Sequence, residues 1–178
     1  MEMRVKAMYK AGDLVVYGGN GVCQIESVAP LPGGEQAYYT MRPLSSDCVI
    51  RVPVTTKTEM REVISREEAQ QLIDGIPDVV AEVYHNRSAT LLAGHYTEAM
   101  RSHRCEDLIG LTMSIYAKKK LAEREKRRIG MIDERYMKRA EELLFGELSV
   151  ALGIPAEQVP DFIDARVGER LAERGQRE

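Results

Sequence analysis

The spacing of the apolar residues changes near residue 64, and this change constrains the fold more than any other feature of the sequence. Residues 12–54 contain short apolar, β-branched runs separated by segments rich in Gly, Pro, Asn and Ser. Beyond residue 64, apolar residues recur at three- and four-residue spacings, which is typical of amphipathic helices. The sequence therefore predicts an α+β protein with a β module at residues 1–64 and a helical module at residues 65–178.

The β module is expected to contain four or five short antiparallel strands. The first apolar run, Leu14–Tyr17, ends at Gly18-Gly19-Asn20-Gly21, where glycine and asparagine accept the positive φ angles of a tight reversal. Further strand-like runs cover residues 22–28, 36–41 and 48–54. A sheet of so few strands must close on itself or expose its edges, so the pattern predicts a small β-barrel or a strongly bent sheet.

The helical module begins with a capping signal at Ser65. Glu68 follows three residues later, the spacing at which a hydroxyl and a carboxylate each satisfy a backbone N–H at a helix start. Glycine and proline residues then separate the periodic segments from one another. We expect helices over residues 66–74, 88–103, 106–128 and 132–152, and a last one after Pro160.

The charge of the chain is unevenly distributed along its length. The formal net charge is −3, yet residues 101–139 carry 12 Lys and Arg against 6 Asp and Glu, a net charge of +6. A basic patch attracts nucleic acid because each neutralised phosphate releases condensed counterions. The same residues, interleaved with Glu123 and Glu125, also fit a solvated helix face, and both interpretations stand at this point.

Several classes of protein find no support in the sequence. No apolar run approaches the about 18 residues of a membrane span, and no secretory signal is recognisable, so we expect a cytoplasmic protein without a membrane partner. Three widely spaced cysteines, Cys23, Cys48 and Cys105, favour reduced thiols over disulfides or a zinc site. Because catalytic and nucleotide-binding motifs are absent, we expect no enzyme activity, catalytic residue, metal site, cofactor or small-molecule substrate.

Three segments in order resemble the CarD/CdnL family of bacterial RNA polymerase-binding transcription regulators, whose module also occurs in transcription-repair coupling factors. The first is Tyr9–Tyr17, read as YKAGDLVVY, followed by Gly21-Val22 and Ile25. The second comprises Gly34-Glu35-Gln36, Tyr38-Tyr39 and Arg51-Val52-Pro53. The third is Ala140–Leu148, read as AEELLFGEL. The resemblance extends over roughly residues 8–152 and is stronger at its two ends than in the middle.

The resemblance implies a Tudor-like N-terminal module that docks on the β subunit of RNA polymerase. In the family, an edge strand of this module pairs with a strand of the polymerase lobe, so that backbone hydrogen bonds supply affinity. Arg51 falls where the family has a polymerase-contacting arginine, and Ile50, Val52 and Pro53 belong to the same strand. The alternative is that Arg51 only solvates the edge of the sheet.

The resemblance further implies a helical C-terminal module that contacts promoter DNA. Family members wedge a tryptophan into the minor groove at the upstream edge of the transcription bubble, and this position, counted from Tyr96, falls on Leu92. Gly94 and His95 stand where the family tends to have arginines. The alternative is that Leu91 and Leu92 are ordinary helix core residues. His95 is a DNA-binding candidate by its position, although a histidine is mostly neutral near pH 7. On charge grounds, the further DNA-binding candidates are Arg101, Arg104, Lys118, Lys119, Lys120, Arg127, Arg128, Arg135 and Arg139.

The leading hypothesis is a non-enzymatic transcription regulator that binds the RNA polymerase β subunit and modulates the stability of the promoter open complex. One alternative is a protein-protein adaptor on RNA polymerase that has lost DNA contact. Another is a small-barrel protein associated with RNA, which the basic segment alone would permit. A steep dependence of DNA affinity on salt separates the first hypothesis from the adaptor.

Overall fold

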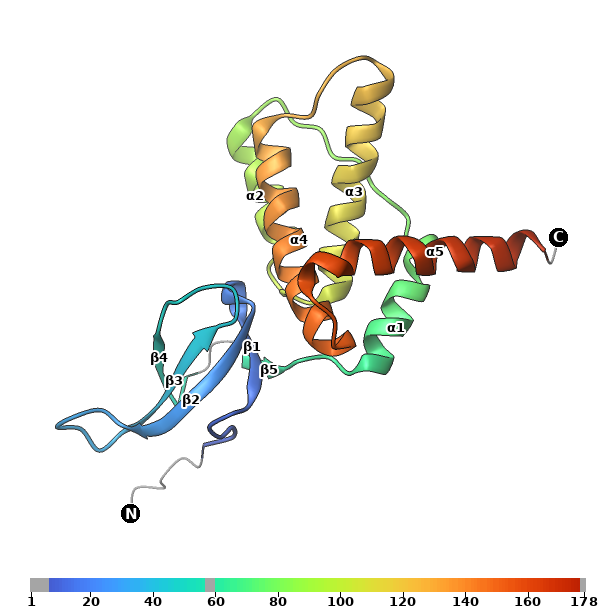
Figure 1. Cartoon of the computed structure of the whole chain (residues 1–178). Coiled ribbons are helices and arrows are strands. Elements are labelled where there is room, and N and C mark those ends of the chain that lie inside the picture. Colours follow the sequence, from blue (N-terminus) through green and yellow to red (C-terminus); the bar gives the residue numbers. More distant parts are fainter. Residues whose placement is uncertain (1–6, 57–59, 177–178) are drawn as a thin grey trace. The chain divides into compact units, whose positions relative to one another are not determined.

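The computed structural model describes residues 7–56 and 60–176 (Figure 1). The chain divides into two compact units, Met1–Val63 and Ile64–Glu178. In the described residues, a five-stranded antiparallel sheet forms the first unit and five α-helices form the second, so the predicted α+β class is confirmed. No helix in this part of the chain is long and apolar enough to cross a membrane.

The strands of the first unit follow one another in the order β4-β3-β2-β1-β5, and every neighbouring pair is antiparallel. Their bounds are β1 Leu14–Tyr17, β2 Val22–Pro30, β3 Ala37–Pro43, β4 Ile50–Pro53 and β5 Met60–Glu62. A single 3₁₀ turn, η1 (Gly18–Asn20), connects β1 to β2. Gly18 and Gly21 have φ angles of 48° and 70°, so the glycines occupy the positions that the reversal requires.

The expected barrel does not close. Within residues 7–56 and 60–176, no ladder joins β4 to β5, and these two strands form the opposite edges of an open sheet. The edge strands β4 and β5 are four and three residues long, and each pairs on one side only, with β3 and β1 respectively. The sheet instead bends around its core, helped by a register shift between Ile25 and Ser27. The buried core of this unit consists of Val15, Cys23, Ile25, Tyr39, Met41 and Val52.

The second unit contains helices close to the predicted ones. Their bounds are α1 Arg66–Asp74, α2 Ala89–Ala99, α3 Cys105–Arg124, α4 Met131–Leu152 and α5 Val159–Gly175, with 3₁₀ turns η2 (Ile76–Asp78) and η3 (Ala156–Gln158). The capping box is confirmed, because the Ser65 hydroxyl accepts from the Glu68 N–H and the Glu68 carboxylate accepts from the Ser65 N–H. Helix α2 ends at Ala99, four residues earlier than expected, and the turn that follows it contains His103 with a φ of 52°.

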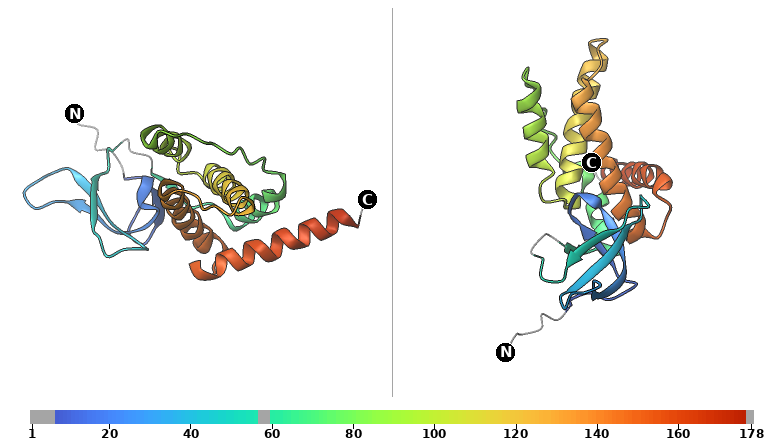
Figure 2. Two further views of the ribbon diagram at one scale, coloured as in Figure 1. Left: turned by 90° about the horizontal axis from the view of Figure 1, so that it is seen from above. Right: turned by 90° about the vertical axis from the view of Figure 1, so that its left-hand side faces the viewer.

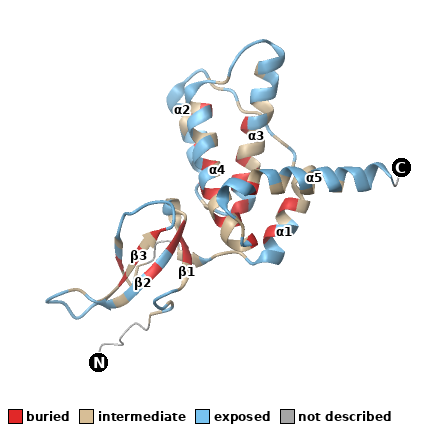
Figure 3. Cartoon of the chain, viewed as in Figure 1, coloured by how far each residue is buried: buried red, intermediate tan, exposed pale blue. Residues whose placement is uncertain are grey.

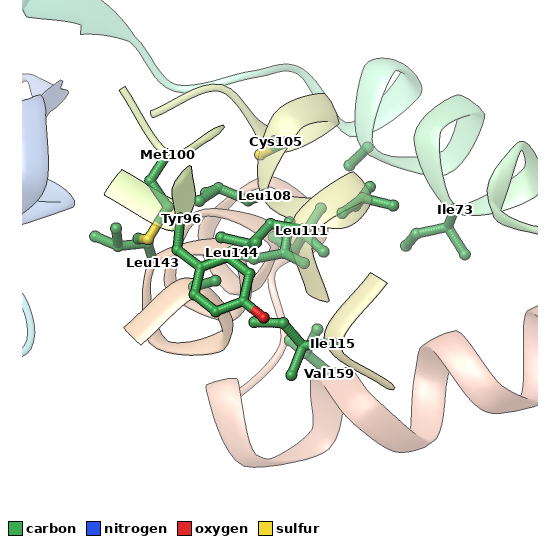
Figure 4. Close-up of a cluster of buried hydrophobic side chains, with 14 of the residues drawn as sticks. Ile73, Tyr96, Met100, Cys105, Leu108, Leu111, Ile115, Leu143, Leu144 and Val159 are labelled. Carbon is green, nitrogen blue, oxygen red and sulfur yellow. The ribbon is translucent and has the colours of Figure 1, made fainter. Parts of the chain in front are cut away.

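Helices α3 and α4 run antiparallel side by side, with α2 alongside them (Figure 2). Buried residues line the facing sides of the helices, whereas the outer sides are exposed (Figure 3). All five α-helices contribute to one core, in which Ile73, Leu108, Ile115 and Leu148 are almost wholly inaccessible. The ring of Tyr96 lies within this cluster (Figure 4).

Candidate functional site

Strand β4 presents one side of its backbone to β3 and the other side outward. Val54 donates its backbone N–H to the Ala37 carbonyl (3.0 Å), and in an antiparallel pair the bonded residues alternate along the strand. The alternation directs the backbone groups of Val52 and Ile50 toward β3 as well. The N–H and C=O of Arg51 therefore point away from the sheet, toward the free edge.

Pro53 limits what this edge offers. It is the next residue after Arg51 whose backbone faces outward, but proline has no N–H, and the Pro53 carbonyl already accepts a hydrogen bond from the Thr56 N–H (2.9 Å). Of the β4 residues, Arg51 is thus the one with both an outward donor and an outward acceptor. A partner strand that adds to this edge must center its hydrogen bonds on Arg51.

The side chains of β4 alternate between the core and the surface. Val52 is 9% exposed and packs in the core of the sheet, and Ile50 is half-buried. Arg51 is exposed on the opposite face, where Thr40 of β3 is its cross-strand neighbour. Its guanidinium makes no hydrogen bond or ion pair with any residue that the structure describes.

A second arginine on the same face shows the contrast. Arg42 lies two residues from Thr40 on β3, and its guanidinium donates to the Glu26 carboxylate (2.9 Å) and to the Asp47 carbonyl (2.7 Å). The hydrogen bond with Glu26 is the main cause that raises the pKa of Arg42 above its ordinary value. The guanidinium of Arg42 is thus occupied by contacts that stabilise the turn before β4, whereas the guanidinium of Arg51 is available to a partner.

The second candidate site is the antiparallel hairpin of α3 and α4. Its residues 118–139, which we call the basic hairpin, contain ten Lys and Arg and four Asp and Glu, a net charge of +6. The rest of the helical unit, residues 64–117 and 140–178, contains eight Lys and Arg and seventeen Asp and Glu, a net charge of −9. The positive charge of the unit is therefore concentrated at one end of this helix pair.

Six of the predicted DNA-binding residues are exposed on the basic hairpin. They are Lys119, Lys120, Arg127, Arg128, Arg135 and Arg139. Three of them form surface ion pairs, Lys120 with Glu123 (3.3 Å), Arg139 with Glu142 (3.5 Å) and Arg127 with Glu125. Exposed pairs of this kind are worth little, so these cations remain able to exchange a carboxylate for a phosphate.

Lys118 differs from its neighbours because its amine is buried. It binds Asp133 at 2.8 Å, and the two side chains are only 11% and 4% exposed. Asp133 also accepts hydrogen bonds from the Tyr96 hydroxyl (2.6 Å) and from the Gly130 backbone N–H (3.1 Å). Burial, followed by the bond to Asp133, raises the pKa of Tyr96 above its ordinary value. This network joins α2, α3 and the start of α4, and Lys118 is not free to contact DNA.

The sequence did not point to this network. Asp133 stands three residues after Gly130, which is the spacing of a capping box without the usual hydroxyl residue, and the structure shows the carboxylate capping α4 in this way. That spacing is the one signal that would have indicated the role of Asp133 as a cap.

Arg101 and Arg104 lie away from the basic hairpin. Both are exposed near the start of α3, and a helix of 20 residues separates its two ends by about 30 Å. Arg101 also pairs with Glu98 (3.3 Å). The structure therefore does not bring these two arginines together with the other predicted DNA-binding residues.

Leu92 and His95 occupy different surroundings on α2. Leu92 is 7% exposed and belongs to the core of the helical unit, while the adjacent Leu91 is 60% exposed. The ring of His95 stacks on that of Tyr84 at a centroid distance of 3.7 Å. It lines a cavity of about 250 Å³ whose other walls include three carboxylate residues, Glu82, Glu106 and Asp107. An acidic cavity repels phosphate, so the surroundings of His95 do not favour a DNA contact.

The chemistry of both candidate sites is that of recognition. Among residues 7–56 and 60–176, no group of three or more His, Cys, Asp or Glu side chains is arranged to hold a metal ion. The free edge offers backbone hydrogen bonds and one unpaired cation, and the basic hairpin offers positive charge at the surface. These features are suited to a protein strand and to a polyanion, respectively.

Comparison with known families identifies the first unit. Residues 9–64 match the model of the CarD-like/TRCF RID domain family. This match confirms that the chain carries a CarD-like domain, and domains of this type interact with the β subunit of RNA polymerase. No curated protein matches the chain.

Proposed function

Because residues 9–64 form a CarD-like/TRCF RID domain, we propose that the protein is a transcription regulator that docks on the RNA polymerase β subunit through the free edge of β4. One observation carries the proposal: Arg51 is exposed and unpaired among the described residues, and it has both backbone groups directed outward on an edge strand.

Docking by strand addition uses each part of this edge. A strand of the polymerase lobe accepts the Arg51 N–H and donates to the Arg51 carbonyl, which extends the sheet by one strand. The guanidinium of Arg51 meets a carboxylate of the partner, and such charge-assisted hydrogen bonds are stronger than neutral ones. Ile50 and Val52 hold β4 against β3 and the core, so the edge is already ordered before it binds.

The basic hairpin supports a role at promoter DNA. We propose phosphate contacts from its exposed cations Lys119, Lys120, Arg127, Arg128, Arg135 and Arg139. A protein that binds the open promoter complex more tightly than the closed one shifts the equilibrium between the two complexes toward the open one, by no more than the difference in affinity. The basic hairpin would favour the open complex to the extent that it meets more phosphates there.

The position of Leu92 argues for electrostatic contact in place of a wedge. Inserting Leu92 into a base step would expose a side chain that is now 7% exposed and would leave a cavity in the helical core. The same observation favours a second candidate function, an adaptor on RNA polymerase whose helical unit has no DNA contact.

Charge reversal at the edge tests the docking proposal. The variant Arg51→Glu is expected to lose binding to a purified β lobe in a pull-down or by calorimetry, because the partner carboxylate then faces another carboxylate. Lys10→Glu is a matched control: it is exposed, lies in the same unit before β1, and changes the net charge by the same amount. Equal binding of Arg51→Glu and Lys10→Glu would refute docking through β4.

A second pair of variants separates the regulator from the adaptor. Lys119 and Arg128 make no hydrogen bond or ion pair with any described residue, so reversing both to Glu changes the surface charge without breaking a described hydrogen bond or ion pair. We expect this double variant to bind a forked promoter fragment at least tenfold more weakly and to lower the salt slope by about 2. The control is Arg101→Glu with Arg104→Glu, which changes the charge equally at the other end of α3. If the unaltered protein does not bind the promoter fragment, or binds it with an affinity that does not depend on salt, the adaptor is favoured.

A further inference from the structure

Tyr116 is the one aromatic side chain that the described part of the helical unit leaves outside its hydrophobic core. Its relative exposure is 50%. The other tyrosine and phenylalanine side chains of this unit belong to the core or pack against it, namely Tyr84, Tyr96, Tyr136, Phe145 and Phe162. The ring of Tyr116 is therefore available to a partner that presents a flat face of its own.

Two exposed cations lie on the same face of α3 as this ring. Lys119 and Lys120 follow Tyr116 by three and four residues, so the three side chains are neighbours on the helix surface. The Lys120 amine lies over the Tyr116 ring, 5.2 Å from its centroid. One helical turn, about 5.4 Å along the axis, thus separates an aromatic face from two cations of the basic hairpin.

The contacts of Lys120 in the free protein are weak ones. Its amine forms an exposed ion pair with Glu123 (3.3 Å) in addition to its contact with the Tyr116 ring. Exposed ion pairs and exposed cation–π contacts both contribute little to stability, because water competes for the charge. The amine is therefore able to turn toward a phosphate while another flat group takes its place over the ring.

We propose that Tyr116 is a stacking site for an unpaired base of single-stranded DNA, and that Lys119 and Lys120 bind the adjoining phosphates. The inference rests on the proposed function, because it adds a second kind of contact to the basic hairpin. A nucleotide supplies both a planar base and a negative charge, which an acidic side chain does not. Stacking is independent of the base sequence, but it requires a base whose face is not covered within a duplex. The cations attract paired and unpaired DNA alike, so Tyr116 gives the helical unit its preference for the unpaired strand.

Fluorescence anisotropy with the full-length protein tests this site. The probes are a labelled oligo-thymidine strand and a labelled duplex of the same length. Tyr116→Ala is expected to weaken binding to the single strand by at least about fivefold, because the stacking of one base is lost, and to change binding to the duplex by less than about twofold. The salt slope of single-strand binding should stay the same, since no charge is removed. Tyr116→Phe keeps the ring and should bind like the unaltered protein.

Leu121→Ala is the matched control for these variants. Leu121 is 45% exposed on the same helix, and five residues place it about 140° around the helix axis from Tyr116, on another face. This variant should bind the single strand like the unaltered protein. Equal losses for Tyr116→Ala and Leu121→Ala, or equal losses on the single strand and the duplex, would overturn the inference and leave the phosphate contacts of the basic hairpin intact.

A fluorescent adenine analogue within the oligo-thymidine strand reports the stack itself, because its emission falls when it stacks on an aromatic ring. The unaltered protein and Tyr116→Phe should quench it, whereas Tyr116→Ala should not. Quenching that persists in Tyr116→Ala would place the base elsewhere and overturn the inference. Tighter binding to an oligo-uridine strand than to oligo-thymidine would assign the site to RNA and overturn the choice of DNA. If the unaltered protein binds neither the single strand nor the duplex, the promoter contacts of the proposed function fail as well.

Discussion

Replacing Asp133 with alanine is expected to destabilise the helical unit severely. The carboxylate is 4% exposed and accepts three hydrogen bonds, from the Tyr96 hydroxyl, the Lys118 amine and the Gly130 N–H. Its removal leaves the Lys118 cation buried without its partner, and breaking a buried ion pair in this way costs about 3–5 kcal/mol. The substitution also removes the cap of α4, a loss that is typically about 1 kcal/mol.

The predicted loss is measured by urea unfolding of the full chain, followed by circular dichroism at 222 nm, which reports mainly on the helices. With a slope of about 1.5 kcal/mol per molar urea, a loss of about 3–5 kcal/mol lowers the midpoint by about 2–3 M. The matched control is the double variant Lys118→Met with Asp133→Leu, which removes both charges together. We expect it to recover most of the loss, because apolar replacements of buried ion pairs are often neutral or stabilising.

A small effect of Asp133→Ala would refute this reasoning. A midpoint within about 0.5 M of that of the unaltered protein would mean that the pair contributes no more than an exposed one does, about 0–1 kcal/mol. A double variant as unstable as the single one would show that the lost cap and the Tyr96 hydroxyl, and not the buried cation, account for the cost.

Three further predictions concern stability and accessibility. The hydrogen bond from Arg166 lowers the pKa of Asp74 below its ordinary value of 3.8. The stability that this ion pair contributes is therefore fully present above pH 3.8 and is lost as the pH falls through the lowered pKa of Asp74. Arg166→Ala should flatten the decline in unfolding free energy between pH 5 and pH 3. Cys48 is exposed and the other two cysteines are buried, so a thiol reagent should label one site per native chain and three in urea. Leu92→Ala should cost about 2–5 kcal/mol, and Leu91→Ala less than about 0.5 kcal/mol, in the same urea assay.

The secondary structure could be predicted from the sequence because the signals that determine it are local. The capping box at Ser65 and the glycines around η1 gave the start of α1 and the first reversal, and both are confirmed. Barrel closure could not be predicted correctly in the same way. It depends on whether β4 and β5, the first and last strands in the sheet order, pair with each other, and no local pattern in the sequence decides that; the structure leaves them as separate edges.

The candidate sites were only partly predictable for a related reason. Arg51 could be singled out from its neighbours in the sequence, yet the sequence does not show that Arg42 has a carboxylate partner, Glu26, while Arg51 has none among the described residues. Likewise, Lys118 and Lys119 are equivalent in the sequence, but helical rotation turns one toward Asp133 and the other to the surface. Tertiary packing decides which of two adjacent cations is available.

Amide hydrogen exchange at Arg51 tests strand addition most directly. The Arg51 N–H points away from β3 in the unbound protein, whereas the Val52 N–H points toward β3 and serves as an internal reference. Exchange measured by nuclear magnetic resonance, with and without a saturating purified β lobe, should slow at least a hundredfold at Arg51 and change little at Val52. An Arg51 amide that exchanges as fast in the complex as in the free protein would contradict docking through the edge of β4.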